Sequence, residues 1–291
     1  MVDWSIYEDI LSEMILPELN SQKAIKEYQE AVRKIRERYN TREKVTVNYE
    51  SEIYQKAYFV AYFPAYAYQM YDILSNLPAN VVTPLLTEGE LRATFIGAGP
   101  GSEFYGFYNF LRKFYSPKRF ELFARFIERE KTWIKYLKAQ KERVYNFLHF
   151  SSTSLKHCDI SNCVSCLNNC TAYKNGVKFV SYQNILNEST LNERDFLDGV
   201  EKVMDKLGEN GIIVFSETKY LRNQELLQKL KQQILNKYPN LKVVSENLIQ
   251  SKEVKLPYNY HPQVLKIFDK NIKLFPRKNV KYYSLVLRKA I

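Results

Sequence analysis

The stretch Leu91–Glu103, with the sequence LRATFIGAGPGSE, decides the fold of this chain of 291 residues. Its apolar first half ends in three glycines at positions 97, 99 and 101, and an aromatic-rich segment compatible with a helix follows at 104–114. Glycines allow the backbone to turn sharply and leave room for a ligand, and a helix N-terminus presents free amides to an anionic group. The stretch therefore predicts a strand, a tight turn and a helix that together bind a ligand.

The spacing of the glycines indicates which ligand. A dinucleotide-binding turn has the pattern G-x-G-x-x-G, which requires a glycine at position 102, where this chain has Ser. The pattern G-x-G-x-G instead resembles motif I of the class I S-adenosylmethionine (SAM)-dependent methyltransferases. The resemblance implies that the cofactor contacts the turn and the start of the helix, at Gly97, Ala98, Gly99, Pro100, Gly101 and Glu103.

Stretches typical of strands alternate with helical stretches through the rest of the chain. The last two strands are joined without a strong helix signal, which matches the methyltransferase order, where the last strand inserts antiparallel; the terminal strand is expected to alternate with a period of two. We therefore expect an α/β fold with a seven-stranded Rossmann-like methyltransferase sheet. The expected strands are Ala93–Ile96, Phe120–Ile127, Val144–Phe150, Val177–Tyr182, Gly211–Phe215, Leu241–Val244 and Lys281–Leu287.

An N-terminal all-helical domain is expected to precede this sheet. Apolar residues recur at helical spacing over 5–39, a second helix is expected from about Glu50, and Pro64 should end or kink it. Three tyrosines one turn apart on that helix are typical of core packing or, alternatively, of a lid whose phenols line an acceptor pocket: Tyr54, Tyr58 and Tyr62. The expected domains are a helical lid or substrate domain at 1–88 and a SAM-binding domain at 89–291, with a Cys-rich loop at 151–176.

The resemblance also implies side chains for the cofactor. In the family, a carboxylate at the end of the second strand accepts hydrogen bonds from the ribose hydroxyls, and Glu128 is the candidate here, with Glu130 as the alternative. The loop after the fourth strand lines the methionine end of SAM and faces the acceptor. This implies that Gln183 and Asn184 contact the cofactor.

Methyl transfer from a sulfonium requires mainly proximity and alignment, and a general base is needed only for a protonated acceptor. Glu188 and Tyr62 are the candidates for that base, whereas His149 is expected to be a core residue of the third strand. The chain departs from the family at Phe95, where an acidic residue is usual, and at Ser151, in a region where an Asp often binds adenine.

All four cysteines of the chain fall within 13 residues between the third and fourth expected strands. A protein of a reducing compartment does not keep disulfides, and four thiolates at short spacing suit a zinc ion or an iron–sulfur cluster. Chance clustering and two disulfides are the alternatives. We predict a metal site formed by Cys158, Cys163, Cys166 and Cys170.

Composition and charge indicate the compartment and the partners. Acidic Asp3 and Glu8 lie where a signal peptide needs positive charge, and the longest apolar run, Ala57–Tyr68, is too short to cross a bilayer. We therefore expect a soluble, cytoplasmic protein that does not contact membranes. The net charge of +11 divides into −4 for residues 1–88 and +15 for residues 89–291, which favours an anionic partner such as RNA, or else a solvated basic surface.

These observations lead to three hypotheses on function. The first is a SAM-dependent methyltransferase whose acceptor is RNA or a ribonucleoprotein, because the catalytic part is basic. The second is a methyltransferase that acts on a small molecule in a tyrosine-lined pocket. The third is a non-catalytic, methyltransferase-like RNA-binding or assembly factor, which Phe95 favours and the intact glycine motif and Glu128 oppose.

Overall fold

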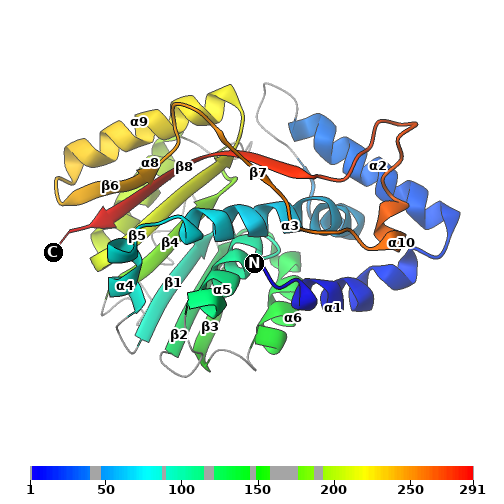
Figure 1. The fold of residues 1–291 in the computed structure, drawn as a ribbon, viewed down its shortest axis with the longest axis horizontal. Coiled ribbons are helices and arrows are strands. Elements are labelled where there is room, and N and C mark those ends of the chain that lie inside the picture. Colours follow the sequence, from blue (N-terminus) through cyan, green and yellow to red (C-terminus); the bar gives the residue numbers. More distant parts are fainter. Residues whose placement is uncertain are drawn as a thin grey trace.

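The computed structural model of the chain describes residues 2–39, 47–86, 90–114, 121–144, 149–157, 176–186 and 193–290. These residues form a twisted sheet between layers of helices, with further helices from the N-terminus at one end of it (Figure 1). The helices are α1 Ser5–Met14, η1 Leu16–Glu18, α2 Gln22–Tyr39, α3 Glu52–Ser75, α4 Ala79–Leu86, α5 Ser102–Phe114, η2 Lys131–Trp133, α6 Ile134–Val144, α8 Glu193–Lys206, α9 Leu221–Lys237 and α10 Pro262–Leu265. The strands are β1 Glu90–Ile96, β2 Glu121–Glu128, β3 His149–His157, β4 Val177–Gln183, β5 Leu207–Thr218, β6 Leu241–Glu246, β7 Lys252–Lys255 and β8 Asn279–Lys289.

The sheet has the strand order β3-β2-β1-β4-β5-β8-β6, and β7 pairs with β8 beside this path. Strands β1 to β5 are parallel to one another, whereas β8 runs antiparallel between β5 and β6. This order confirms the expected Rossmann-like methyltransferase sheet with an antiparallel last strand, and adds the short β7. Because the chain leaves β1 toward β2 on one side and later forms β4 on the other, the carboxyl ends of β1 and β4 border the crevice in which such folds bind ligands.

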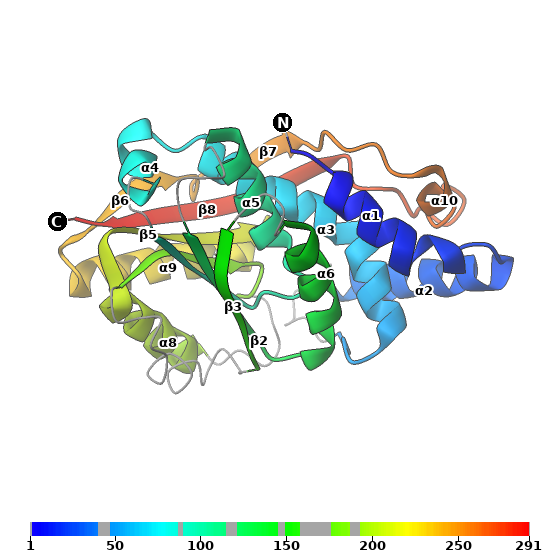
Figure 2. The ribbon, with the colours of Figure 1, turned by 90° about the horizontal axis from the view of Figure 1, so that it is seen from below.

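Different helices cover the two faces of the sheet (Figure 2). Helices α3 and α5 pack on one face against residues such as Phe95 and Phe126, while α8 and α9 pack on the other against residues such as Ile96 and Ile213. Strand β8 is consequently buried at every residue over Tyr282–Leu287. The expected period of two is absent there, because a strand covered on both faces needs no polar side.

The N-terminal helices depart from their expected pattern in two respects. The expected helix over 5–39 is divided into α1 and α2, because Pro17 lies in the short η1 between them. The expected end at Pro64 is wrong, since α3 continues through this buried proline as one helix. A proline removes one helical hydrogen bond, and the almost complete burial of α3 around Pro64 offsets that loss.

Helix α3 joins the N-terminal helices to the sheet. It lies against α5 so closely that a Cβ atom on Gly106 would be 2.2 Å from the carbonyl oxygen of Ala67. One apolar cluster includes residues of α1, α2 and α3 together with residues of β1 and β2. We keep the division into residues 1–88 and 89–291 as a proposal, with the addition that the two parts share this cluster.

The segment between β6 and β8 returns over the N-terminal helices, and α10 lies next to α1 and α2 (Figure 1). The indole nitrogen of Trp4 donates a hydrogen bond to the carbonyl oxygen of Pro257, at 3.1 Å. The hydroxyl of Tyr258 donates to the carboxylate of Glu8, at 2.6 Å. The segment after β7 is therefore held against α1.

None of the helices in the described part of the chain combines the length and the apolar character that a bilayer crossing requires.

Candidate cofactor site

The glycine stretch forms the expected tight turn between β1 and α5. Gly97, Gly99 and Gly101 all have positive φ angles, of 67°, 48° and 84°. The amide of Gly97 donates to the carbonyl oxygen of Ile127 at the end of β2, at 2.8 Å, which fixes the turn to the neighbouring strand. At Gly101 a Cβ atom would lie 2.6 Å from a methyl group of Leu137, so a side chain at this position would require Leu137 to move. The space beside Gly99 is open, which leaves its backbone accessible to a ligand.

Glu128, the last residue of β2, faces this turn. Its carboxylate accepts hydrogen bonds from the amide of Gly99 at 2.7 Å and from the amide of Glu130 at 2.8 Å. Burial raises the pKa of Glu128, and the two amide donors oppose that rise. The alternative residue, Glu130, instead accepts hydrogen bonds from the amide and the hydroxyl of Thr132, at 3.0 and 2.7 Å, at the start of η2.

A cavity of about 310 Å³ opens where β1, β2 and β4 end. The backbone of Gly97, Gly99 and Pro100 forms one part of its wall, and Glu128 and Glu130 form another. Residues of the N-terminal helices and of the turn before α3 close the opposite side, among them Tyr39, Asn48, Tyr49 and Tyr58. The cavity therefore lies in the crevice where this strand order predicts a ligand.

Gln183 and Asn184, at the end of β4, both line the cavity. The side-chain nitrogen of Gln183 donates to the carbonyl oxygen of Tyr66 at 2.9 Å, and the side-chain oxygen of Asn184 accepts from the amide of Thr218 at 2.9 Å. The other polar atoms of these two buried side chains, Gln183 Oε1 and Asn184 Nδ2, have no hydrogen-bond partner among the described residues. Buried polar atoms are normally paired, so these two atoms indicate that a polar ligand completes the site.

Three aromatic side chains lie together on one side of the cavity, with their rings tilted against one another. The ring centroids of Tyr49 and Trp133 are 5.5 Å apart, those of Tyr58 and Trp133 are 5.6 Å apart, and those of Tyr49 and Tyr58 are 5.4 Å apart. Sequence reasoning did not place Tyr49 or Trp133 in the site. The position of Trp133, three residues after Glu130, was the one local signal for it.

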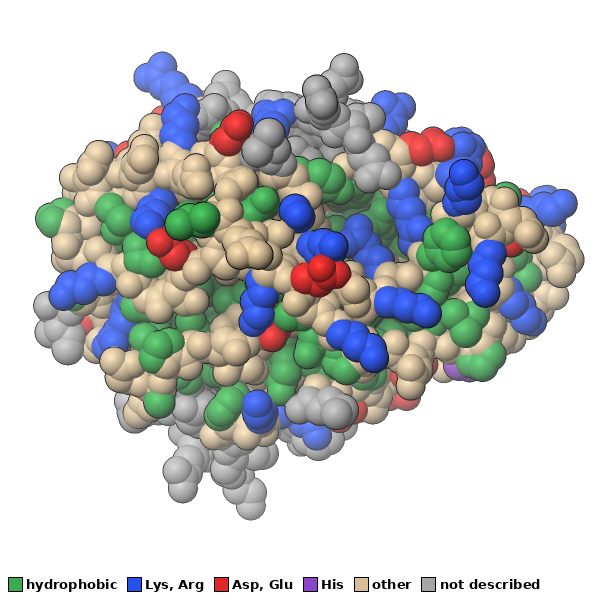
Figure 3. Space-filling model, turned by 45° about the horizontal axis from the view of Figure 1, so that its top comes forward, with side chains coloured by type: hydrophobic (Ala, Val, Ile, Leu, Met, Phe, Trp, Pro, Cys, Tyr) green, Lys and Arg blue, Asp and Glu red, His purple; other side chains and the backbone are tan. Residues whose placement is uncertain are grey.

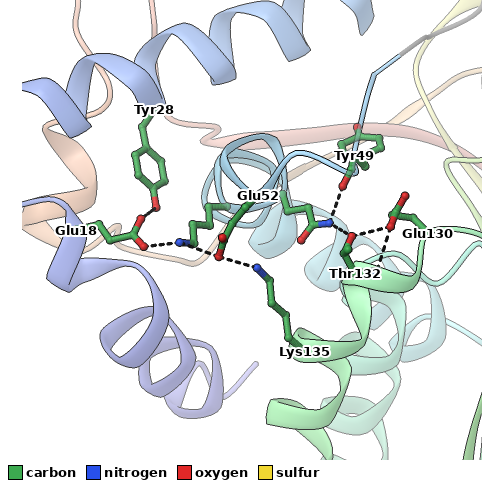
Figure 4. A network of polar contacts seen from close by, with 9 residues as sticks. Glu18, Tyr28, Tyr49, Glu52, Glu130, Thr132 and Lys135 are labelled. Atoms are coloured by element: carbon green, nitrogen blue, oxygen red, sulfur yellow. Dashed lines mark hydrogen bonds and ion pairs between the residues drawn. The ribbon is translucent and has the colours of Figure 1, made fainter.

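Polar contacts connect α3 to the helix that follows β2 (Figure 4). Glu52 of α3 forms ion pairs with Lys135 of α6 at 2.9 Å and with Lys56 at 3.0 Å, and Lys56 also contacts Glu18. The hydrogen bonds and charges of Lys135 and then Lys56 lower the pKa of Glu52 to about 2. These contacts hold the N-terminal helices in register with the wall of the cavity.

Gln55 extends this connection into the site itself. Its side-chain nitrogen donates to the carbonyl oxygen of Tyr49, at 2.5 Å, and to the hydroxyl of Thr132 (Figure 4). Because Thr132 bonds in turn to Glu130, one side chain of α3 links two lining residues of the cavity.

Several residues expected at the site lie elsewhere in the structure. Ala98, Gly101 and Glu103 belong to the turn and to α5 but do not line the cavity. Glu103 is 4% exposed, its Oε1 has no partner among the described residues, and burial followed by the charge of Glu128 raises its pKa well above the usual value. Tyr62 is fully buried and lines a neighbouring cavity.

The remaining candidates fall outside the described residues. These are the second base candidate, Glu188, and the four cysteines of the predicted metal site, Cys158, Cys163, Cys166 and Cys170. Within the described part of the chain, no group of three or more His, Cys, Asp or Glu side chains is placed to bind a metal.

No protein-family model and no curated protein matches the chain. Solved structures do match. A precorrin-6y C5,15-methyltransferase from Geobacter metallireducens is 14% identical, with 74% of this chain and 91% of that chain covered and a TM-score of 0.42. A putative rRNA methylase from Clostridium thermocellum is 12% identical, with 77% of this chain and 94% of that chain covered and a TM-score of 0.41. A SAM-dependent methyltransferase from Clostridium acetobutylicum is 10% identical, with 77% of this chain and 92% of that chain covered and a TM-score of 0.43. The strand order and the glycine turn of this chain are those of the class I methyltransferase fold.

Proposed function

We propose that the protein is a SAM-dependent methyltransferase. The observation that carries the proposal is the cavity at the ends of β1, β2 and β4, which combines an exposed glycine backbone, a carboxylate and two unpaired polar atoms. SAM has a part that suits each of these features. The cofactor supplies, when bound, a methyl group already activated on a positively charged sulfonium.

Each feature of the cavity has a role in holding that cofactor. The carboxylate of Glu128 would accept hydrogen bonds from the ribose hydroxyls, and the backbone at Gly99 and Pro100 leaves room for the amino-acid end. Gln183 Oε1 would accept a hydrogen bond from the ammonium group, and Asn184 Nδ2 would donate one to an acceptor oxygen of the cofactor. Adenine could stack on the ring face of Trp133, with the tilted ring of Tyr49 at its edge.

The acceptor hypotheses differ in what the structure offers them. The basic charge of residues 89–291 supports RNA or a ribonucleoprotein, whereas the tyrosines between α2 and α3 support a small molecule. We favour the small molecule, because Tyr39, Tyr58 and Tyr62 lie directly beside the cavity. Tyr62 remains our candidate for a base among the described residues, and Glu188 remains a candidate from the sequence.

Phe95 supports the non-catalytic alternative. It replaces the acid that usually holds the ammonium of SAM, and its ring packs in the core against Phe104, Phe126 and Phe179, with centroids 5.5, 5.3 and 5.8 Å away. An assembly factor with a degenerate site would retain the fold and not bind SAM.

Calorimetric titration with SAM and with S-adenosylhomocysteine separates these alternatives. We expect binding in the micromolar range by the wild type and none by Gly99→Arg, because an arginine there fills the space beside the turn. Thr83→Arg adds the same charge at an exposed position of α4 and should bind like the wild type. A folded wild-type protein that binds neither ligand would overturn the methyltransferase proposal and favour the assembly factor.

The metal site at Cys158, Cys163, Cys166 and Cys170 also remains a proposal, supported by the clustering of the cysteines in the sequence. Elemental analysis of the purified protein should find about one zinc ion or one iron–sulfur cluster per chain. Replacement of Cys163 and Cys166 by Ser should remove it. Protein that is isolated anaerobically without metal would contradict the proposal.

A further inference from the structure

A second cavity, of about 430 Å³, lies beside the proposed cofactor cavity. Tyr39 lines both cavities. Tyr62 lines the second one and stacks on Tyr58 of the first, with ring centroids 5.2 Å apart and an interplanar angle of 18°. The ring of Tyr39 is 5.6 Å from that of Tyr62. The two cavities therefore adjoin at Tyr39 and at the stacked rings of Tyr58 and Tyr62.

The lining of the second cavity contains four cations and no acidic residue: Arg36, Lys219, Arg277 and Lys281. Lys281 forms an ion pair with Glu253 at 3.0 Å, whereas no carboxylate of the described residues lies within ion-pair distance of the other three. Glu217, next to the lining residue Thr218, directs its carboxylate to the amides of Ile185 and Leu186, at 2.8 and 3.0 Å. The positive charge in this cavity is thus largely uncompensated by the chain itself.

Arg277 is held so that its N–H groups remain available. The central carbon of its guanidinium lies 4.6 Å from the ring centroid of Tyr62 and 5.7 Å from that of Tyr66. Stacking on aromatic rings fixes the plane of a guanidinium but uses none of its five N–H donors. No described residue accepts a hydrogen bond from this side chain. A planar group with free donors at its edge is the arrangement that binds carboxylate or phosphate with two hydrogen bonds.

Arg36 brings a second guanidinium to the same cavity. It donates a hydrogen bond to the carbonyl oxygen of Phe275, at 2.5 Å, which ties α2 to the loop before β8. Burial lowers the pKa of Arg36, and the positive charge of Arg277 lowers it further. Two partly buried like charges repel each other, and a bound anion would offset both the repulsion and the loss of solvation. The face in Figure 3 has a hollow bordered by Lys and Arg side chains, with hydrophobic side chains at its floor.

We propose that this second cavity is the acceptor site, and that it binds a small aromatic acid through its carboxylate or phosphate, held between Arg36 and Arg277. The proposal rests on the proposed methyltransferase function, because the second cavity is an acceptor site only if SAM binds in the neighbouring cofactor cavity. The aromatic lining, Tyr39, Tyr62 and Tyr220, receives the flat body of the acceptor. The methyl group passes directly from the sulfonium to a nucleophilic atom of the acceptor where the two cavities adjoin, and the sulfur leaves as the neutral thioether. A protonated acceptor releases its proton to water.

Small probes test the proposal without knowledge of the natural acceptor. Phenyl phosphate and benzoate carry the two anions on an aromatic ring, and benzamide is a neutral counterpart. Binding to the full chain, with and without saturating S-adenosylhomocysteine, can be followed by saturation-transfer NMR and titration. We expect at least one anionic probe to bind together with S-adenosylhomocysteine, and benzamide to bind at least about tenfold more weakly than that probe.

Matched variants locate the binding. Arg277→Gln and Arg36→Gln should each lower the affinity for the anionic probe at least about tenfold, and Arg277→Lys should retain part of that affinity. Lys278→Gln is the control, because Lys278 is exposed, adjacent to Arg277 and absent from the lining, and its replacement removes the same charge. All variants should bind S-adenosylhomocysteine like the wild type, which also shows that they are folded.

The outcomes are distinct. If S-adenosylhomocysteine binds and neither anionic probe does, or if the probes bind Arg277→Gln as well as the wild type, the acceptor proposal is overturned and the methyltransferase proposal stands. Displacement of the probe by S-adenosylhomocysteine would place it in the cofactor cavity and also overturn the acceptor site. Loss of affinity for a single-stranded RNA in both arginine variants, without any binding of the small probes, would assign the cavity to RNA instead. If the wild type does not bind S-adenosylhomocysteine, the proposed function fails, and the acceptor role fails with it.

Discussion

The carboxylate of Glu128 accepts a hydrogen bond from the backbone amide of Gly99, with 2.7 Å between oxygen and nitrogen, so the end of β2 holds the turn after β1. The same carboxylate lines the proposed cofactor cavity. We expect Glu128→Gln to weaken S-adenosylhomocysteine binding about tenfold, because a charged acceptor contributes about 1.5–3 kcal/mol to a hydrogen bond.

Glu130→Gln is the matched control for that measurement. Glu130 lines the same cavity, but its Oε1 accepts from the amide and the hydroxyl of Thr132 at the start of η2, whereas Glu128 accepts from the glycine turn. Its replacement should change the affinity by less than about threefold. Equal losses in the two variants, measured by calorimetry, would contradict the assignment of the ribose to Glu128.

Gly106 provides a test in which local and tertiary effects have opposite signs. Replacement of a glycine inside a helix by alanine normally adds about 1 kcal/mol of stability. Here the new Cβ would lie 2.2 Å from the carbonyl oxygen of Ala67 and 2.8 Å from Cβ of Met70. We therefore expect Gly106→Ala to lower the free energy of unfolding by about 1–3 kcal/mol, measured by urea denaturation. A stabilised variant would show that α3 and α5 are less closely packed than the structure indicates.

Glu103 provides a test of burial through pH. Its pKa is raised in the folded state, first by burial and then by the charge of Glu128, so the folded protein retains a proton that the unfolded chain loses above about pH 4.5. This residue should therefore make the protein less stable as the pH rises above that value. Glu103→Gln removes the charge and should raise the free energy of unfolding at pH 8 by more than about 1 kcal/mol.

The control for Glu103 is Glu225→Gln, at an exposed position of α9. The free energy of unfolding of both variants and the wild type can be measured from pH 4 to pH 8. Only Glu103→Gln should show a weaker dependence of this free energy on pH. If the free energy of unfolding of Glu103→Gln depends on pH as that of the wild type does, ionisation of Glu103 does not destabilise the folded protein.

Glu52 tests the opposite sign. Lys135 and Lys56 lower its pKa to about 2 in the folded protein, from an ordinary value of 4.5. The stability that these contacts contribute is present above pH 4.5 and should be lost as the pH falls from there toward 2. Because the side chain of Glu52 is 64% exposed, we expect Glu52→Gln to cost less than about 1 kcal/mol at pH 7. The melting temperatures of variant and wild type should converge near pH 2, and a difference that persists there would implicate packing instead.

Local sequence predicted the parts of the fold that depend on neighbouring residues. The turn at Gly97, Gly99 and Gly101 has the positive φ angles that only glycine adopts easily, so its pattern is specific. The end of a helix at Pro64 was predicted incorrectly, because the burial of α3 outweighs the missing hydrogen bond of one proline. The break between α1 and α2 at Pro17 was not predicted, because apolar residues recur at helical spacing on both sides of this proline.

The second cavity could not be predicted from any local pattern. Arg36 lies in α2 and Arg277 in the loop before β8, and only the return of the chain over the N-terminal helices brings them together. The wall of Tyr49, Tyr58 and Trp133 has the same origin, since Tyr49 precedes α3 and Trp133 follows β2. Sequence patterns placed the glycine backbone, Glu128, Gln183 and Asn184 at one cavity, whereas its aromatic side depends on contacts between distant segments.

The place of β8 in the sheet has a consequence for the synthesis of the protein. Strand β5 ends at Thr218, and the strand that covers its edge begins at Asn279, so 60 residues must leave the ribosome in between. During that interval the edge of β5 in a nascent chain has no partner strand. Strand β6 is also synthesised before β8, the strand with which it pairs. Unpaired edges of this kind invite contacts between chains. Folding of this sheet is therefore completed late in translation. Closely spaced ribosomes on one mRNA, or slow elongation over residues 219–278, should increase aggregation of the nascent chains.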